Sequence, residues 1–194
     1  MTKRLGILLS GRGSHFEAIA ASVEAGRIDA EIAAVISNRL DARGLEAARQ
    51  RGLNAVLIPS KRLDREVYDR MGAPSSRSAP GYMRLLSAYF VREFPLRILN
   101  IHPSLLPSFP GLEAQHQALE HGVKISGCTV HFVDELLDAG PIVVQRAVAM
   151  LDQDTEETLA ASILEQEHRA YTEAIRIALS GGFRIQGRRV LLGS

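Results

Sequence analysis

Three short apolar runs alternate with two helix-forming segments at the start of the chain. The apolar runs are Arg4–Leu9, Ala30–Ser37 and Asn54–Ile58. The segments between them favour helix and end at Gly26 and Gly52, and glycine commonly ends a helix. Strands and helices that alternate through such short links predict a parallel sheet joined by crossover helices. We therefore expect an α/β fold built on an open, mostly parallel sheet with helices on both faces.

The rest of the chain predicts shorter elements and one long helix. Expected helices cover Asp64–Arg70, Leu85–Phe94, Gln117–Glu120 and Asp154–Leu179, and expected strands cover Arg97–Ile101, Cys128–Val133 and Ile142–Val148. Only the short turn Leu136–Gly140 lies between the last two strands, and this close spacing predicts antiparallel edge strands towards the C-terminus. Asp154 can cap the long helix with Glu157 reaching back, and Gly181 can end it. A short strand pair or a loose end follows from Phe183.

The composition limits the kind of protein. The 194 residues carry 23 Lys and Arg against 22 Asp and Glu, so bulk charge does not indicate a nucleic-acid binder. A single cysteine excludes an internal disulfide and a Cys-based zinc site. It also fits a reducing cytoplasm. No apolar run approaches the roughly 18 residues of a membrane span, and the N-terminal run is too short for a signal peptide. We expect a cytoplasmic protein of one large domain or two small ones.

The link after the first apolar run is Gly11-Arg12-Gly13-Ser14. Its glycines allow backbone amides to approach an anion, and the N-terminus of the next helix adds positive potential, so the loop favours a phosphate. An ordinary turn between strand and helix is the alternative. The loop lacks the third glycine of a dinucleotide-binding fingerprint and the Lys-Ser/Thr of a Walker loop. Ser37-Asn38 also stand where an acidic residue would end the second strand, which disfavours a nicotinamide oxidoreductase.

Asn100 and His102 stand two residues apart at the end of an expected strand, so their side chains share one side of it. Open α/β sheets bind ligands at this end. The Asn100 amide can donate to an oxygen that gains charge, and His102 can move a proton, which suits acyl chemistry. A carboxylate from Asp134–Pro141 could pair with His102 and hold its tautomer. A polar strand end and an ordinary acidic turn are the alternatives.

The remaining polar candidates favour structural roles. Cys128 lies in an apolar strand and is expected to be a buried, inert thiol. His131, in the same strand, belongs either to the core or to a site. The other residues weighed are His116, His121 and His168, which lack metal-ligand spacing with one another, and Glu165, Glu167 and Arg169, which are typical of a solvated helix face.

Long motifs cover most of the chain. They include LLSGRGSHFEAI, AAVISN, GLEAARQRG, YMRLLSAYFV, ILNIHPSLLPSFPGLEAQHQALEHG, GCTVHFVDELLDAGPIVVQ and ILEQEHRAY. Together they resemble the phosphoribosylglycinamide (glycinamide ribonucleotide) formyltransferases, a branch of the folate-dependent formyltransferase family. NIHPSLLP followed by LDAGP is specific to that family. The short length and the SGRGS loop favour the glycinamide branch over the tRNA formyltransferases.

The resemblance implies a Rossmann-like fold and a single formyltransferase domain over 1–194. Within it, 1–70 would bind the ribonucleotide, 71–81 would be a disrupted segment, and 82–194 would form the folate and catalytic half. The implied reaction transfers a formyl group from 10-formyltetrahydrofolate, as co-substrate, to the amino group of glycinamide ribonucleotide in purine biosynthesis. No metal is implied. Small molecules would be the only partners of a monomer or homodimer, with no nucleic acid and no membrane.

The resemblance also implies a role for individual residues. Asn100 would polarise the formyl oxygen, His102 would be the general acid and base, and Asp138 would favour the charged form of His102 and order the attack. The ribonucleotide would be bound by Gly11, Arg12, Gly13, Ser14, His15 and Glu167. The folate site would be lined by Arg65, Met83, Arg84, Leu85, Leu86 and Leu137.

The sequence departs from the family pattern at three places. His15 stands where the phosphate loop usually has asparagine, and Glu113–His116 is unusual but lies away from the implied catalytic positions. Met71–Gly81 reads MGAPSSRSAPG where family members place a central strand resembling VDLVCLAG. Codons for Pro74–Pro80, read one base earlier, can give VVALCAG. We therefore hypothesise a small deletion with a frameshift, which sequencing of the gene would refute if no shifted frame encodes an apolar run; a divergent loop is the alternative.

Three functions stay open at this point. An active formyltransferase is the leading interpretation. A silent relative that has lost a central strand, and at most binds the ribonucleotide, is the second. A formyltetrahydrofolate hydrolase, with water in place of the amine, is the third. The family's hydrolases carry an additional N-terminal domain that this sequence does not contain, so we expect the transferase.

Overall fold

The structure is a computed structural model that describes residues 2–59 and 86–193. The expected helix Asp64–Arg70, the segment Met71–Gly81 and the implied folate residues Arg65, Met83, Arg84 and Leu85 lie outside the described residues. The chain divides into two compact units, Met1–Asn100 and Ile101–Ser194.

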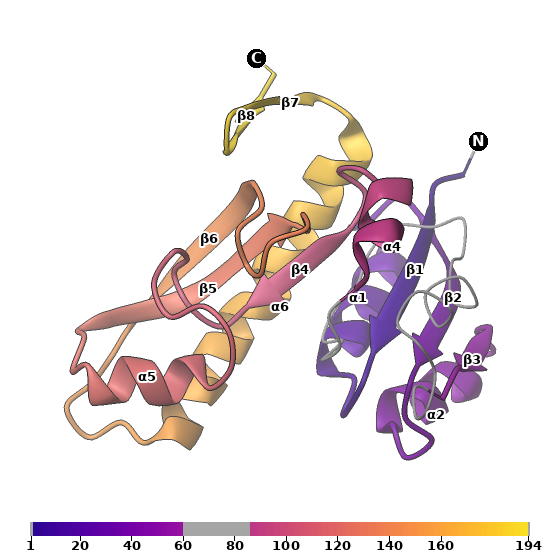
Figure 1. The fold of residues 1–194 in the computed structure, drawn as a ribbon. Helices are drawn as coiled ribbons and strands as arrows, with labels where there is room; N and C mark the ends of the chain where they lie inside the picture. Colours follow the sequence, from indigo (N-terminus) through magenta and orange to yellow (C-terminus); the bar gives the residue numbers. More distant parts are fainter. Residues whose placement is uncertain (1, 60–85, 194) are drawn as a thin grey trace. The chain divides into compact units, whose positions relative to one another are not determined.

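The first unit contains the predicted alternation of strands and helices. Its elements are β1 (Arg4–Leu9), α1 (Ser14–Glu24), β2 (Glu31–Ser37), α2 (Arg43–Gln50), β3 (Ala55–Leu57) and α4 (Ala88–Glu93). The strands lie side by side in the order β1-β2-β3, and both pairs are parallel (Figure 1). Apolar side chains of β1, α1 and α2, including Ile7, Phe16 and Leu45, are almost completely buried. This burial explains why runs without polar alternation fold as strands between helices.

The second unit contains a mixed sheet and a long helix. Its elements are β4 (Leu99–His102), which begins two residues before the unit boundary, α5 (Ala114–Glu120), β5 (Ile125–Phe132), β6 (Ile142–Ala149), α6 (Glu156–Ser180), β7 (Phe183–Gln186) and β8 (Arg189–Leu192). The strand order is β4-β5-β6-β8-β7. β5 pairs with β6 and β7 pairs with β8 in antiparallel orientation, whereas β6 and β8 are parallel.

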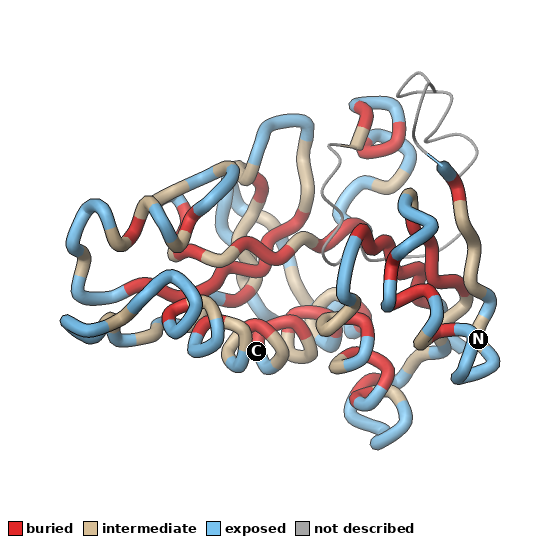
Figure 2. The backbone as a smooth tube through the Cα atoms, turned by 90° about the horizontal axis from the view of Figure 1, so that it is seen from below, coloured by how far each residue is buried: buried red, intermediate tan, exposed pale blue. Residues whose placement is uncertain are grey.

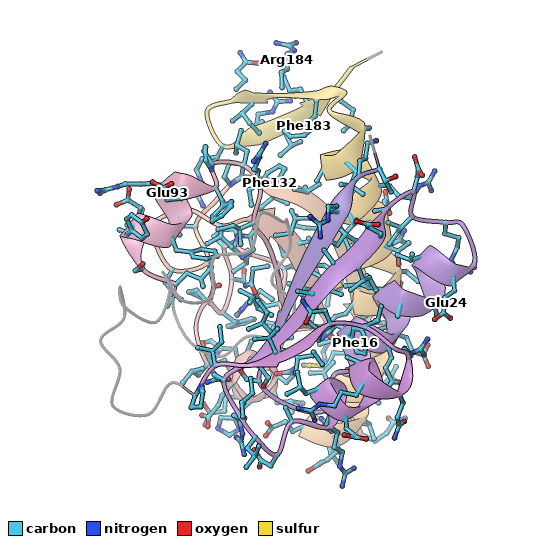
Figure 3. The ribbon with its side chains drawn as sticks, turned by 90° about the vertical axis from the view of Figure 1, so that its right-hand side faces the viewer. Phe16, Glu24, Glu93, Phe132, Phe183 and Arg184 are labelled. Atoms are coloured by element: carbon cyan, nitrogen blue, oxygen red, sulfur yellow. The ribbon has the colours of Figure 1, made fainter. Side chains whose placement is uncertain are left out.

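Helix α6 packs along β5 and β6 and supplies the main apolar layer of this unit (Figure 1). Leu159, Ile163 and Tyr171 on its inner face are at most 1% exposed. The ring of Phe132 at the end of β5 stacks on Phe183 of β7 with 5.2 Å between centroids (Figure 3). Figure 2 shows how buried and exposed stretches alternate along the backbone.

The predicted α/β class, with parallel strands first and antiparallel strands towards the C-terminus, is confirmed. Several predicted boundaries are wrong by a few residues. Helix α4 begins at Ala88 rather than Leu85, because the Ser87 hydroxyl accepts a hydrogen bond from the Phe90 N–H and caps it. β4 covers Leu99–His102 rather than Arg97–Ile101, and both α5 and β5 begin three residues earlier than predicted, at Ala114 and Ile125.

The predicted cap of the long helix is also wrong. Thr155, not Asp154, is the N-cap, and its side chain and that of Thr158 bond reciprocally to each other's backbone N–H. The Asp154 carboxylate instead accepts from the Leu151 N–H at 2.7 Å and from the Thr158 hydroxyl at 2.8 Å. Gly181 ends the helix in the left-handed conformation, as predicted.

Over residues 2–59 and 86–193, no helix is both long and apolar enough to cross a bilayer.

Candidate active site

Asn100 and His102 both belong to β4, and the alternation of a strand places them on one side of it. Asn100 is half-buried and His102 is 5% exposed. Nε2 of His102 lies 2.7 Å from the carbonyl oxygen of Phe109. Because a carbonyl oxygen only accepts, Nε2 carries the hydrogen. His102 therefore presents its other ring nitrogen, Nδ1, to the rest of the site.

Nδ1 of His102 faces Asp138. The Nδ1 to Oδ2 distance is 3.4 Å, and the two side chains are 6% and 8% exposed. The predicted pairing of His102 with a carboxylate from the acidic turn thus has a defined partner. Asp134, at the start of that turn, instead accepts a hydrogen bond from the Leu136 N–H at 2.9 Å and stabilises the turn.

The backbone of the acidic turn brings the Asp138 carboxylate inward. Asp138 has a φ of 48°, in the left-handed region. Gly140 lies against the end of β5, where a Cβ atom would stand 1.8 Å from the Phe132 carbonyl oxygen. The turn can therefore return this close to β5 only with glycine at that position.

Two further groups from the second unit contact the Asp138 carboxylate. Oδ2 accepts from the Gly111 N–H at 2.9 Å, and Oδ1 lies 3.7 Å from Nε2 of His131. Burial by itself would raise the pKa of Asp138, but His131, the Gly111 N–H and the charge of His102 outweigh it and hold the pKa below its ordinary value. Asp138 therefore stays ionised at neutral pH.

The loop that follows His102 is anchored by two polar side chains of β5 and β6. The Thr129 hydroxyl accepts from the Leu106 N–H at 3.0 Å and donates to the Ser104 carbonyl at 2.7 Å. Gln145 donates to the Leu106 carbonyl at 2.9 Å. These bonds fix the loop that presents the Phe109 carbonyl to His102. Sequence reasoning did not identify Thr129 or Gln145, because only strand pairing brings them to this loop.

The Gly-rich loop lies in the first unit, between β1 and α1. Gly13 is the N-cap of α1 with a φ of 83°. A Cβ atom on Gly13 would stand 2.5 Å from Cα of Gly44 at the start of α2, so close packing alone requires glycine there. Gly11 and Arg12 are exposed, whereas Ser14 and His15 are half-buried in the first turn of the helix. The loop thus offers exposed backbone before a helix N-terminus, an arrangement suited to an anion.

The other residues named from the sequence differ in how exposed they are. Glu165 and Arg169 are exposed as expected, but Glu167, also expected on the solvated face, is 6% exposed on the buried face of α6. Leu137 is 56% exposed and Leu86 is half-buried. Among the described residues, no group of three or more His, Cys, Asp or Glu side chains has the geometry of a metal site.

The predicted inert character of Cys128 agrees with its environment. Its side chain is fully buried in β5. Burial, together with the charge of Glu167, raises the pKa of this thiol to about 12. Cys128 is therefore a core residue rather than a nucleophile.

Comparison with known proteins places this geometry in a family. Residues 3–175 match the family described as formyl transferase. The chain is 43% identical over 173 residues to phosphoribosylglycinamide formyltransferase of Escherichia coli, covering 85% of this chain and 82% of that one. It is 45% identical over 192 residues to the trifunctional purine biosynthetic protein adenosine-3 of Drosophila pseudoobscura, where it spans 94% of its own length and only 14% of that protein.

Solved structures have the same fold. Glycinamide ribonucleotide transformylase 1 of Symbiobacterium toebii superposes with a TM-score of 0.94 at 48% identity, over 100% of this chain and 95% of that one. A formyltetrahydrofolate deformylase of Pseudomonas syringae superposes with a TM-score of 0.91 at 26% identity, over 100% of this chain and 67% of that one. The matched residues span the Gly-rich loop, His102 and Asp138, and the chain is a member of the formyl transferase family.

Proposed function

We propose that the chain transfers a formyl group from 10-formyltetrahydrofolate to the amino group of glycinamide ribonucleotide in purine biosynthesis. The observation that carries this proposal is the buried contact between His102 and the ionised carboxylate of Asp138. Asn100 shares the strand and the strand side of His102. A donor amide, an imidazole and a buried carboxylate together make a site for acyl transfer.

In this mechanism the amino nitrogen of the ribonucleotide attacks the formyl carbon, and the formyl oxygen gains negative charge. Asn100 donates a hydrogen bond to that oxygen. His102 takes a proton from the amine and gives it to the folate nitrogen as the carbon–nitrogen bond to folate breaks, through a ring nitrogen that exchanges its present partner for the substrate. Asp138 stabilises the charged imidazole and keeps its ring oriented.

Substrate binding is divided among the remaining residues. The phosphate of the ribonucleotide would bind the loop Gly11–Ser14 with His15 in the first helical turn, and Glu167 would also bind the ribonucleotide. Of the residues that would line the folate site, Leu86 and Leu137 are described, and the exposed side chain of Leu137 would offer apolar surface to a pterin ring. The partners are small molecules, without nucleic acid or membrane. We place this chemistry in the cytoplasm of the cell, in a monomer or homodimer.

The experiment that tests the proposal is formyl transfer by the purified chain. A deaza analogue of 10-formyltetrahydrofolate is supplied with and without glycinamide ribonucleotide, and the deformylated folate is followed by absorbance. We expect turnover only when the ribonucleotide is present. Turnover that does not need it would favour the hydrolase. A folded protein with no turnover would favour the silent relative.

A further inference from the structure

His131 is a buried histidine that the mechanism above does not use. It lies at the end of β5 and is 2% exposed. The pairing of β5 with β6 shifts register between Val130 and His131, and such an irregularity redirects a side chain relative to regular alternation. His131 thus has a local cause for pointing away from the regular face pattern of its strand.

One ring nitrogen of His131 is committed to the backbone. Nδ1 lies 2.9 Å from the Phe132 carbonyl oxygen. That oxygen only accepts, so Nδ1 carries the hydrogen. The other ring nitrogen, Nε2, is the one that lies 3.7 Å from Oδ1 of Asp138. This distance is long for a hydrogen bond and within the range of an ion pair.

His102 is held in the same way, but with the roles of its two ring nitrogens exchanged. Its Nε2 donates to the Phe109 carbonyl and its Nδ1 faces Oδ2 of Asp138. The buried imidazoles of His102 and His131 are each held by a backbone carbonyl, and each faces a different oxygen of the Asp138 carboxylate. A proton on either remaining nitrogen turns that contact into a charge-assisted interaction. His131 is thus placed to fix which Asp138 oxygen is left for His102.

We propose that His131 is a positioning residue for formyl transfer, which holds Oδ1 of Asp138 so that Oδ2 remains directed at His102. The kinetic consequence of this inference rests on the proposed function, whereas the contact between His131 and Asp138 is independent of it. In a purely structural role, His131 would matter only through its bond to the Phe132 carbonyl. The two roles use different ring nitrogens, and amide side chains of two lengths separate them.

The experiment compares His131→Gln with His131→Asn. A glutamine amide reaches about as far as Nε2 and can still donate to Oδ1 of Asp138, whereas an asparagine amide reaches about as far as Nδ1 and preserves only the bond to Phe132. We expect H131N to lower kcat by 10-fold to 100-fold with KM for both substrates within about twofold of wild type, and H131Q to recover most of kcat. The reverse order, or equal loss in both variants, would overturn the proposal.

A double-variant cycle gives an independent kinetic test. If His131 acts through Asp138, H131N should cost far less in the Asp138→Asn background than in the wild-type background. Losses that multiply would mean that His131 acts separately, which would contradict the proposal. Thermal unfolding of each variant shows whether the compared proteins are folded.

A spectroscopic measurement decides the question if the variants do not fold or the wild type shows no ribonucleotide-dependent transfer. The imidazole nitrogens of His131 and His102 are followed by NMR in the wild type and in D138N. We expect the resonances of both histidines to move when the carboxylate becomes an amide. A His131 resonance unchanged in D138N would overturn the contact, whereas absent transfer with a shifted resonance would count against the proposed function alone.

Discussion

Nδ1 of His102 lies 3.4 Å from Oδ2 of Asp138, and neither side chain is more than 8% exposed. The two residues are far apart in sequence and meet because β4 pairs with β5 and the acidic turn folds back beside the end of β5. The surrounding donors keep the carboxylate ionised. A charge held this close to a buried imidazole is the feature on which the proposed chemistry depends.

Removal of that charge should abolish most of the activity. We expect Asp138→Asn to lower kcat by roughly 10²-fold to 10⁴-fold, the range for loss of acid–base function. Asp134→Asn is the matched control, because it neutralises a carboxylate on the same turn and keeps an oxygen for the Leu136 N–H. Steady-state formyl transfer by both variants checks this. A similar loss of kcat in both variants would mean that activity depends on the net charge of the turn rather than on the pair of His102 and Asp138.

Asp138 should also make stability depend on acid pH. Its pKa is lower in the folded protein than in the unfolded chain, so the folded state binds this proton less tightly. Its contribution is therefore present above the unfolded value of about 4 and is lost as the pH falls through the folded value. Urea unfolding should show the wild type more stable than D138N at pH 7, with a smaller difference at pH 3. A difference that stays constant between these pH values would contradict the assignment.

Cys128 should be unreactive in the folded protein. A pKa of about 12 leaves on the order of one thiolate in 10⁴ molecules at pH 8, and the side chain is fully buried. We expect no labelling by Ellman's reagent under native conditions and labelling of one thiol per chain in urea. Rapid native labelling would show that β5 opens readily or that the thiol is exposed.

Substitution of Gly13 should damage both folding and phosphate binding. An alanine there would meet Gly44 Cα at 2.5 Å and would need a left-handed φ of 83°. Gly26→Ala is the control, because its φ is +68° and no atom lies within 4 Å of the added Cβ; strain alone should cost about 1–2 kcal/mol. We expect Gly13→Ala to be the less stable variant and to raise KM for the ribonucleotide, with folate KM unchanged. Equal unfolding midpoints in the two variants would refute the packing argument.

Replacement of Pro74–Pro80 by VVALCAG should stabilise the protein and strengthen folate binding. The family pattern places a central strand in this segment, and a central strand makes ladder hydrogen bonds on both of its edges. Each buried backbone group that gains a partner is worth roughly 1–3 kcal/mol. We expect a higher thermal midpoint and a lower folate Kd than in the present chain. A polar replacement of the same length is the control, and unchanged values for VVALCAG would show that this segment is tolerated as it stands.

Local sequence patterns predicted most of the fold. Strands β1 and β2 are apolar except at their ends, where Arg4, Glu31 and Ser37 lie, and the glycines after α1 and α6 mark where these helices end. The predicted N-cap of α6 is one residue too early because Asp154 and Thr155 are both good caps, and only the three-dimensional hydrogen bonds select Thr155. Glu167 was expected on the exposed face because its side chain is charged. It is buried because that face of α6 packs against the sheet.

The candidate site was predicted only in part. Asn100 and His102 stood out because a strand period of two places them together. The choice of Asp138 over Asp134 and Glu135 depended on the family resemblance, since any of the three carboxylates could have faced the histidine. The contacts of His131 with Asp138 and of Thr129 with the loop after His102 come from strand pairing and a register shift. Short-range periodicity carries no signal for contacts of this kind.

The most direct test of the account is the fate of a labelled formyl group. The chain is given a ¹³C-formyl folate and glycinamide ribonucleotide, and the products are separated by mass spectrometry. We predict that the label appears on the ribonucleotide with the wild type and with D134N, and that D138N transfers almost none. Label recovered as free formate, or left on the folate by a folded wild-type chain that still binds the ribonucleotide, would contradict formyl transfer at the His102–Asp138 pair.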